Sequence, residues 1–500
     1  MNTYVEYITV NGSNEIRSTL KNIQTLRNQK NLENKDVTKN KEEKEEIKFI
    51  ELTEIFAGDL PPDFENLTDV EKHQVVKKLV TRNFPNQPES LSEITAGTFF
   101  PGEHTRNPDI KPSWYDEEKF LRGQKFAQDN YVGLFLSELL SLFLLFSFED
   151  GLKPIIFTQN TSEPYTSFKR YLSLSSRVRN WYTTCPFTKG TPAYKDIQVV
   201  KRMHGLARKK FDSSTNEEID RVTSLKDTWA PTRDLLVEDF RETCEAPLPG
   251  QCPYAMNEVK GKRPKGLSQG EMASTQCAFV CLMILYPEKF GVHDKCEEDL
   301  EAFCHLWRGL GFLLGIEDEF NFCRGTLEDV KLRSRNFIDY WGRPNFRVST
   351  REWEHMLRCA HEGKHWYYPR ISYEMDLLYL TEMLELNMPR LKALITPSDW
   401  ITYNMTKFII KYPFRVPQIK SFFNKHLNQS IDRALKYDQK EHEKLREKSA
   451  KIIKEASATG VDKIRHSSLS DNIVAQLKFV KIFMSFLVFS VLWRAISFLI

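Results

Sequence analysis

The chain has 500 residues, of which 41% are hydrophobic and 28% charged, so it can bury a sizeable core and is not disordered as a whole. Its 71 Lys and Arg residues against 68 Asp and Glu residues leave a net charge of +3, which is too balanced for a dedicated nucleic-acid binder. Aromatic residues make up 12% of the chain and favour apolar cavities or lipid-like partners over polar metabolites. No repeat period is present among the 23 Pro and 21 Gly residues, which excludes collagen-like and simple repeat architectures.

The N-terminal part of the chain carries few structural signals. Residues 1–50 are rich in Asn, Lys and Glu and can bury too little apolar area to offset their ordering entropy, which predicts a disordered or solvated tail. They also lack the basic and apolar regions of a secretory signal. Residues 51–112 mix short apolar patches with Pro-rich breaks, and we expect an irregular lead-in with one helix near Val70–Arg82.

From Trp114 onward, apolar segments at helical spacing predict one large, mainly α domain over residues 113–405. Residues 120–150 are expected to form a single long helix that is buried at the centre of this domain, and Glu138 argues against a membrane span there. Residues 212–265 carry many charges and Pro breaks and are expected to form a surface excursion. Further helices are expected at 165–182, directly after Pro164, and at 195–211, 270–286, 297–315, 351–362, 372–386 and 397–411.

The C-terminal part of the chain predicts a tether to a membrane. Residues 406–470 carry opposite charges at helical spacings, as in a charged helical stalk and linker. Residues 477–500 are expected to form a hydrophobic anchor helix, since the apolar run Ile482–Ile500 would span roughly 28 Å as a helix. Lys478 at its entry would place the preceding domain on the cytosolic side. The alternative is an amphipathic helix packed on the body of the protein.

Cysteine spacing and short motifs limit the classes of binding site and catalysis that the chain can contain. The 9 cysteines include no C-x-x-C pair, which predicts free thiols in a cytosol-facing protein. The sequence contains no P-loop and no G-x-S-x-G motif, and the glycines of Gly309–Gly315 do not have the spacing of a dinucleotide fingerprint.

His204 is the first candidate for chemistry. It lies on the apolar stripe of the helix expected at 195–211, where a neutral imidazole needs a hydrogen bond or a metal. Arg208 adds a cation one turn later, and a His with an Arg one turn away can bind iron and pair with a carboxylate of the same cofactor, which suits haem. Arg170 on the preceding helix is a third candidate for this site. The simpler alternative for His204 is a core histidine satisfied by a hydrogen bond.

A second candidate is the string HEGKH at His361–His365, formally the H-E-x-x-H pattern of zinc proteases. On a helix, its two His would share a face and Glu362 could be a general base. Gly363 and Lys364 weaken a buried helix, the following Trp-Tyr-Tyr-Pro sequence ends it, and no third ligand with family spacing follows. The simpler interpretation is a charged helix end, with a zinc metalloprotease as the alternative.

Several stretches together resemble a known family of haem-dependent oxygenases. It contains bacterial rubber oxygenase (latex-clearing protein) and the fungal ER-bound oxygenase of mycophenolic acid biosynthesis, and the chain looks closest to animal members with the same catalytic domain. The resemblance covers about residues 113–405, and its specific parts are the His204-x-x-x-Arg208 helix and the ending LGIEDEFN. The other stretches are WYDEEKFLRGQKFAQDN, the Arg170 helix, VVKRMHGLARKKF, QGEMASTQCAFVCLMILYPEKFG and FCHLWRGLGFLLG.

The resemblance implies a haem b site in which His204 is the axial iron ligand and Arg208 is its companion. It implies that Arg170 helps to shape the distal, catalytic side of the pocket. The implied function is a haem b-dependent oxygenase that uses O2 to oxidise or cleave a C=C bond of an isoprenoid or other lipid-like substrate. We expect a membrane-associated protein, in the endoplasmic reticulum with a cytosolic catalytic domain, and no nucleic-acid partner. The alternative is a membrane-tethered helical haem- or lipid-binding protein without oxygenase turnover.

The sequence departs from the family on the distal side. The family often has Thr four residues after the distal Arg, where this chain has Leu174, and some bacterial members use a distal Lys where this chain has Ser173. Arg179 followed by Thr183 offers a second register. Arg170 keeps the better spacing to the axial histidine.

Overall fold

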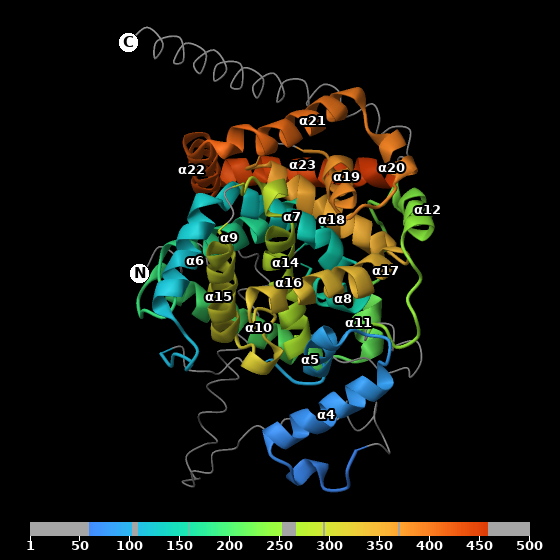
Figure 1. The fold of residues 1–500 in the computed structure, drawn as a ribbon. Coiled ribbons are helices and arrows are strands. Elements are labelled where there is room, and N and C mark those ends of the chain that lie inside the picture. Colours follow the sequence, from blue (N-terminus) through green and yellow to red (C-terminus); the bar gives the residue numbers. More distant parts are fainter. Residues whose placement is uncertain are drawn as a thin grey trace, which may run out of the picture. The chain divides into compact units, whose positions relative to one another are not determined.

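The structure is a computed structural model that describes residues 60–102, 109–159, 161–252, 267–293, 296–368 and 371–458 (Figure 1). All of these residues belong to one compact unit, which spans Phe49–Ile500. They form helices and no β-strand, apart from a single antiparallel bridge between Pro101 and Ser268. The expected mainly α class is therefore confirmed. The tail expected at 1–50 and the anchor helix expected at 477–500 lie outside the described residues.

Most consecutive helices are joined by short connections, with longer ones between α5 and α6 and between α12 and α14. The α-helices are α4 (Asp69–Asn83), α5 (Glu89–Gly97), α6 (Glu117–Asp129), α7 (Tyr131–Phe146), α8 (Glu149–Phe157), α9 (Pro164–Thr183), α10 (Pro192–Ser213), α11 (Asn216–Thr223), α12 (Arg233–Thr243), α14 (Gln269–Leu285), α15 (Glu297–Leu314), α16 (Leu327–Asn336), α17 (Arg343–Phe346), α18 (Arg351–His365), α19 (Tyr373–Met383), α20 (Pro389–Leu394), α21 (Pro397–Lys411), α22 (Pro417–Ala434) and α23 (Gln439–Ala458). The remaining turns are the 3-10 helices η1 (Phe64–Asn66), η3 (Pro287–Phe290), η4 (Asp318–Phe320) and η6 (Pro413–Arg415) and the π-helix η5 (Phe337–Gly342).

Local sequence signals set several helix ends as expected. Thr68 and Glu71 form a reciprocal capping box at the start of α4, which confirms the helix expected near Val70–Arg82. Pro164 is the first residue of α9, where its missing N–H costs nothing. Gly315 ends α15 in the left-handed region, at φ 107°, as expected of a C-terminal glycine cap.

The single long helix expected at 120–150 is wrong. α6 and α7 are separate helices whose axes meet at an angle of 86°, with Asn130 between them. The Asn130 side chain donates to the Phe126 carbonyl at 2.9 Å and accepts from Lys420 Nζ at 2.7 Å, so it is fixed at the bend from both sides. α7 itself is the buried central helix that the apolar pattern predicts.

Three closely packed helix pairs form the core, namely α6 with α15, α7 with α14, and α9 with α18 (Figure 1). Glycines permit two of these close approaches. A Cβ at Gly123 would lie 2.2 Å from the Ala302 carbonyl oxygen, and one at Gly363 would lie 2.5 Å from the Phe168 nitrogen. α18 continues through Gly363 to His365 because this glycine lets α9 cross at short range, which offsets its low helix propensity.

Residues 212–252 are less exposed than the predicted surface excursion. α11 buries Ile219, and α12 buries Leu236 and Phe240. The fully buried Asp239 carboxylate accepts from the Leu391 N–H at 2.9 Å and pairs with Arg390 at 3.0 Å, which fixes α12 to α20. At least one charged residue of this segment, Asp239, therefore forms a buried ion pair, which the charge-rich local sequence did not predict.

The C-terminal helices of the described region pack on the same unit. The boundary expected between residues 405 and 406 falls inside α21. α22 packs on α6, α7 and α9, and the buried Ser449 of α23 accepts from the Tyr165 N–H at 3.2 Å. Among the described helices, none is by itself long and apolar enough to cross a membrane, although α6 and α7 meet the length and composition criteria as a bent pair.

Candidate functional site

The candidate residues of the sequence lie on two consecutive helices, α9 and α10, that contact each other. Asn180 donates to Asp196 at 2.8 Å, and Arg177 pairs with the same carboxylate at 3.6 Å, which fixes the antiparallel register. Counting the same number of residues away from this contact along each helix reaches Arg170 on α9 and the neighbours of His204 on α10. Residues that are distant in the sequence therefore lie at the same level of the hairpin.

The inner face of α10 is buried at both ends, at Ile197 and at Phe211, and only partly buried at His204 between them. Ile197 is fully buried and Lys201 is 4% exposed, whereas His204, on the same face, is half-buried. A Cβ added at Gly205 would meet no atom within 4 Å. The imidazole of His204 thus lies where the inner face of α10 becomes accessible.

The two candidate arginines have different partners, since Arg208 pairs with a carboxylate and Arg170 contacts a neutral hydroxyl. Arg208 donates to the Leu267 carbonyl at 3.4 Å and pairs with Asp212 at 3.4 Å. Arg170 donates to the hydroxyl of the buried Thr161 at 2.9 Å. Both guanidinium groups are partly buried, so a further anion could bind them at small desolvation cost.

Arg179, the alternative candidate for the distal arginine, contacts α22 and not α10. Arg179 pairs with Asp432 at 2.8 Å and donates to the Asn428 carbonyl at 3.3 Å, so it faces α22. Arg170 instead shares a helix face with Arg177 and Asn180, which contact α10. The geometry therefore favours Arg170 as the arginine on the α10 side.

Arg177 is a residue that the sequence reasoning missed. Its Nη1 donates to the Ser173 hydroxyl, and its buried Nε has no hydrogen-bond partner in the described part of the chain. Ser173 stands where some members of the resembled family have a distal lysine, so a guanidinium reaches that position from the next turn of α9. The i, i+4 spacing of Ser173 and Arg177 is the sequence feature that could have predicted this contact.

Partly exposed apolar side chains occur on four helices that are otherwise core elements. On α7 the partly exposed residues are Glu138, Leu142 and Leu145, which share one face, and all its other residues are buried. Phe279 of α14 stacks on Trp307 of α15 at 4.3 Å. For the proposal below, five of the partly buried apolar residues that pack against the core are called the apolar lining, namely Leu142, Leu145, Leu174, Val200 and Phe279.

A carboxylate, Glu138, lies on α7 one turn from this lining, and the ammonium group of Lys364 interacts with it electrostatically. Neither was identified from the sequence as a site residue. Tyr182 donates to Glu138 at 3.3 Å. Lys364 of α18 is 4% exposed, and its Nζ lies 5.0 Å from the ring centres of both Phe135 and Tyr171. Burial lowers the pKa of Lys364 to about 8, against the opposing effect of Glu138. No hydrogen bond or ion pair holds this ammonium group within the described ranges.

Glu138 should make the stability of the fold depend on pH. Burial raises its pKa to about 7, although Lys364 and the Tyr182 hydroxyl lower it in part. The folded chain then holds this proton more tightly than the unfolded chain, so its contribution is complete below the usual carboxyl pKa of 4.5 and is lost as the pH rises through 7. We expect Glu138→Gln to flatten the fall in the free energy of unfolding over this range, at about 1.4 kcal/mol per pKa unit.

Urea denaturation at a series of pH values measures this effect. The exposed Glu118→Gln is the matched control and should leave the pH profile unchanged. An identical profile for Glu138→Gln and the unmodified protein would show that the Glu138 carboxyl titrates normally.

The HEGKH string does not assemble a metal site in the described part of the chain. His361 donates from Nδ1 to the Leu357 carbonyl at 2.8 Å, and its Nε2 lies 3.1 Å from the Asp376 carboxylate. Glu362 accepts from Trp366 at 3.1 Å. No group of three His, Cys, Asp or Glu side chains that could hold a metal ion occurs among these residues. The zinc alternative therefore gains no support.

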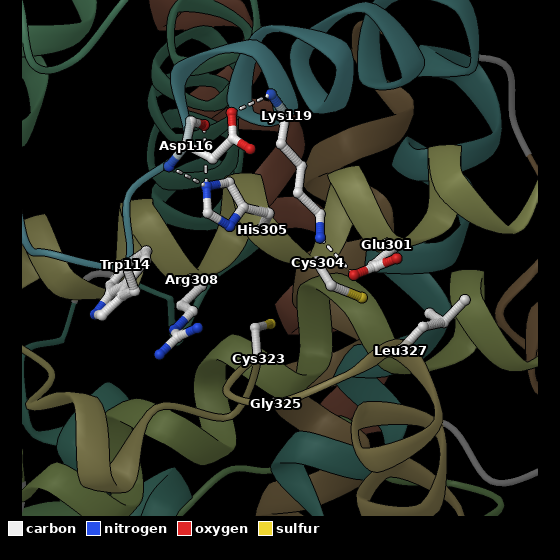
Figure 2. Close-up of a pocket in the computed structure, with 10 residues that line it drawn as sticks. All are labelled: Trp114, Asp116, Lys119, Glu301, Cys304, His305, Arg308, Cys323, Gly325 and Leu327. Atoms are coloured by element: carbon white, nitrogen blue, oxygen red, sulfur yellow. Dashed lines mark hydrogen bonds and ion pairs between the residues drawn. The ribbon is translucent and has the colours of Figure 1, made fainter.

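A separate cavity of about 210 Å³ lies between the start of α6 and α15 (Figure 2). Its charges are largely neutralised, because Lys119 pairs with Glu301, and Arg308 pairs with Asp318 at 2.7 Å. Burial also raises the pKa of the Cys304 thiol to about 12, so it stays protonated. The cavity is lined by Trp114, Asp116, Lys119, Glu301, Cys304, His305, Arg308, Cys323, Gly325 and Leu327.

The cavity and the apolar lining lie on different sides of α15. His305 contacts the cavity, whereas Trp307, two positions later, stacks on Phe279 of the lining.

All nine cysteines of the chain are free, as expected. No known protein family matches the chain, and no curated protein or solved structure matches it either.

Proposed function

We propose that the chain is a haem b-dependent oxygenase in which His204 is the axial iron ligand. The observation that carries the proposal is the inner face of α10, which is buried at Ile197 and Phe211 and only partly buried at His204 between them. A histidine at such a partly buried position can present a ring nitrogen to a ligand that packs along the helix. The empty space at Gly205 supports the same arrangement, because a flat macrocycle must approach the backbone closely.

The residues around His204 fit the chemistry of haem. The apolar lining would contact the macrocycle, Arg208 would pair with a carboxylate of the cofactor, and Arg170 would help to shape the distal side of the pocket. When bound, the haem iron supplies the dioxygen chemistry that no side chain of the chain can supply.

Two groups of the chain would act on the distal side. The Arg177 guanidinium, held by the Ser173 hydroxyl, would donate hydrogen bonds to polar atoms there. Glu138 would exchange a proton near neutral pH, because burial raises its pKa to about 7 and the Tyr182 hydroxyl fixes one of its oxygens. The apolar lining would exclude water from these groups.

The substrate class follows from the lining. Aliphatic and aromatic side chains suit an isoprenoid or similar lipid with a C=C bond better than a polar metabolite. Such a substrate is dissolved in a membrane, which agrees with the apolar sequence of residues 477–500 and with the proposed location at the endoplasmic reticulum. The second candidate is a haem- or lipid-binding protein without turnover, which the departures at Ser173 and Leu174 favour.

Absorption spectroscopy of the full chain tests the proposal. We expect a Soret band at one haem per chain, followed by O2 uptake on addition of a polyprenyl substrate such as squalene. A Soret band without O2 uptake over a panel of polyprenyl lipids would favour the binding protein. No Soret band after reconstitution with hemin would refute the oxygenase and any haem-binding role.

A further inference from the structure

Exposed apolar side chains are concentrated on one part of the fold. Fifteen large hydrophobic residues of the described chain are exposed, and five of them fall within residues 401–422. Single exposed apolar residues are normal on soluble proteins, but a cluster marks an interaction surface. The five are Ile401, Phe408, Tyr412, Val416 and Phe422.

These side chains follow one continuous outer edge. Ile401, Phe408 and Tyr412 recur at helical spacing along α21 and its end, and the rings of Phe408 and Tyr412 lie 5.2 Å apart. The short turn η6 then leads directly to Val416 and to Phe422 on α22. Figure 1 shows α21 and α22 at the margin of the fold. The opposite face of α21 is buried, so the exposed edge belongs to a helix that is already packed.

The same segment is basic. Between Asp399 and Asp432 the chain contains no Asp or Glu and five Lys or Arg residues. Two of these cations are used inside the fold, since Lys407 pairs with Glu382 at 2.8 Å and Lys420 donates to Asn130 at 2.7 Å. The other three are Lys411, Arg415 and Lys425, which are exposed and make no ion pair with the described residues.

We infer that this apolar and basic face docks on the surface of an anionic lipid bilayer. We call it the docking face, and it consists of Ile401, Phe408, Lys411, Tyr412, Arg415, Val416 and Phe422. Exposed aromatic and aliphatic side chains can enter the interfacial region of a bilayer, while the basic side chains contact its headgroups.

The positive charge of the docking face favours an anionic bilayer as its partner. Each Lys or Arg near an anionic membrane surface contributes about 1 kcal/mol, so Lys411 and Arg415 together supply a useful part of the binding energy. Their charges alternate with apolar side chains along the edge, as in helices that lie in the membrane interface. The apolar sequence after α23 would keep the face close to the bilayer, but the inference is independent of the proposed oxygenase activity.

Hydrogen–deuterium exchange of the full chain locates the contact. We expect slower exchange over residues 408–422 when vesicles of phosphatidylcholine and phosphatidylserine are added. We expect a much smaller effect with phosphatidylcholine alone or at high salt. Vesicle binding without any change at 408–422 would assign membrane contact to another segment and overturn the inference.

A charge-reversal pair tests the energetics on the full chain. Lys411→Glu with Arg415→Glu should lower the phosphatidylserine-dependent binding by about tenfold or more, since two favourable charges become unfavourable. Lys78→Glu with Lys226→Glu changes the net charge equally at exposed positions elsewhere and should change binding by less than about twofold. An equal loss in both pairs, or no loss in the first, would contradict the docking face.

Discussion

His204→Ala is expected to abolish stoichiometric haem binding by the chain. The imidazole is the only nitrogen ligand that the proposal assigns to the iron, so the variant would retain only pocket contacts to the cofactor. We expect the Soret absorbance per chain to fall below about one tenth of that of the unmodified protein after reconstitution with hemin. Absorption spectroscopy with a pyridine haemochrome assay measures this directly.

Added imidazole separates loss of the ligand from loss of the fold. If His204→Ala only removes the axial nitrogen, free imidazole should occupy its space and restore part of the Soret band. His426→Ala, at an exposed position of α22, should keep full haem content. Unchanged haem content in His204→Ala would remove this residue from the role of iron ligand.

Arg358→Leu is expected to lower the free energy of unfolding by about 3–5 kcal/mol, the largest stability effect that we predict. Arg358 is 4% exposed and lies between two carboxylates, with Nε donating to Glu354 at 2.6 Å and Nη2 donating to Glu374 at 2.7 Å. Thr232 also accepts from it at 3.1 Å. Removing the guanidinium would leave Glu354, which is fully buried, without its compensating charge.

Chemical denaturation of matched variants measures this effect. Arg351→Leu on the same helix is the control, because Arg351 is 60% exposed and lies 3.4 Å from Asp234. It should change the free energy of unfolding by about 0–1 kcal/mol. Glu354→Leu combined with Arg358→Leu should be less destabilising than the sum of the single variants. A loss below about 1 kcal/mol for Arg358→Leu would mean that the pair contributes no more than a surface contact.

The sequence by itself determined the mainly α class and many helix limits. The period of apolar residues and local signals such as Pro164 and Gly315 act within one or two turns, so they hold wherever the helix packs. The sequence also singled out His204 and Arg170, which the α9–α10 hairpin places at one level. Their roles toward haem stay predictions.

Only the tertiary structure decided the features that depend on distant partners. The apolar pattern continues from α6 into α7, and the bend at Asn130 is held by Lys420 from another part of the chain. From the sequence, Gly363 only lowers the helix propensity of α18. The structure shows that a glycine is needed there because α9 crosses at short range. The charges of Glu138 and Lys364 likewise acquire their pKa shifts from burial between packed helices, since desolvation depends on neighbours that no local pattern specifies.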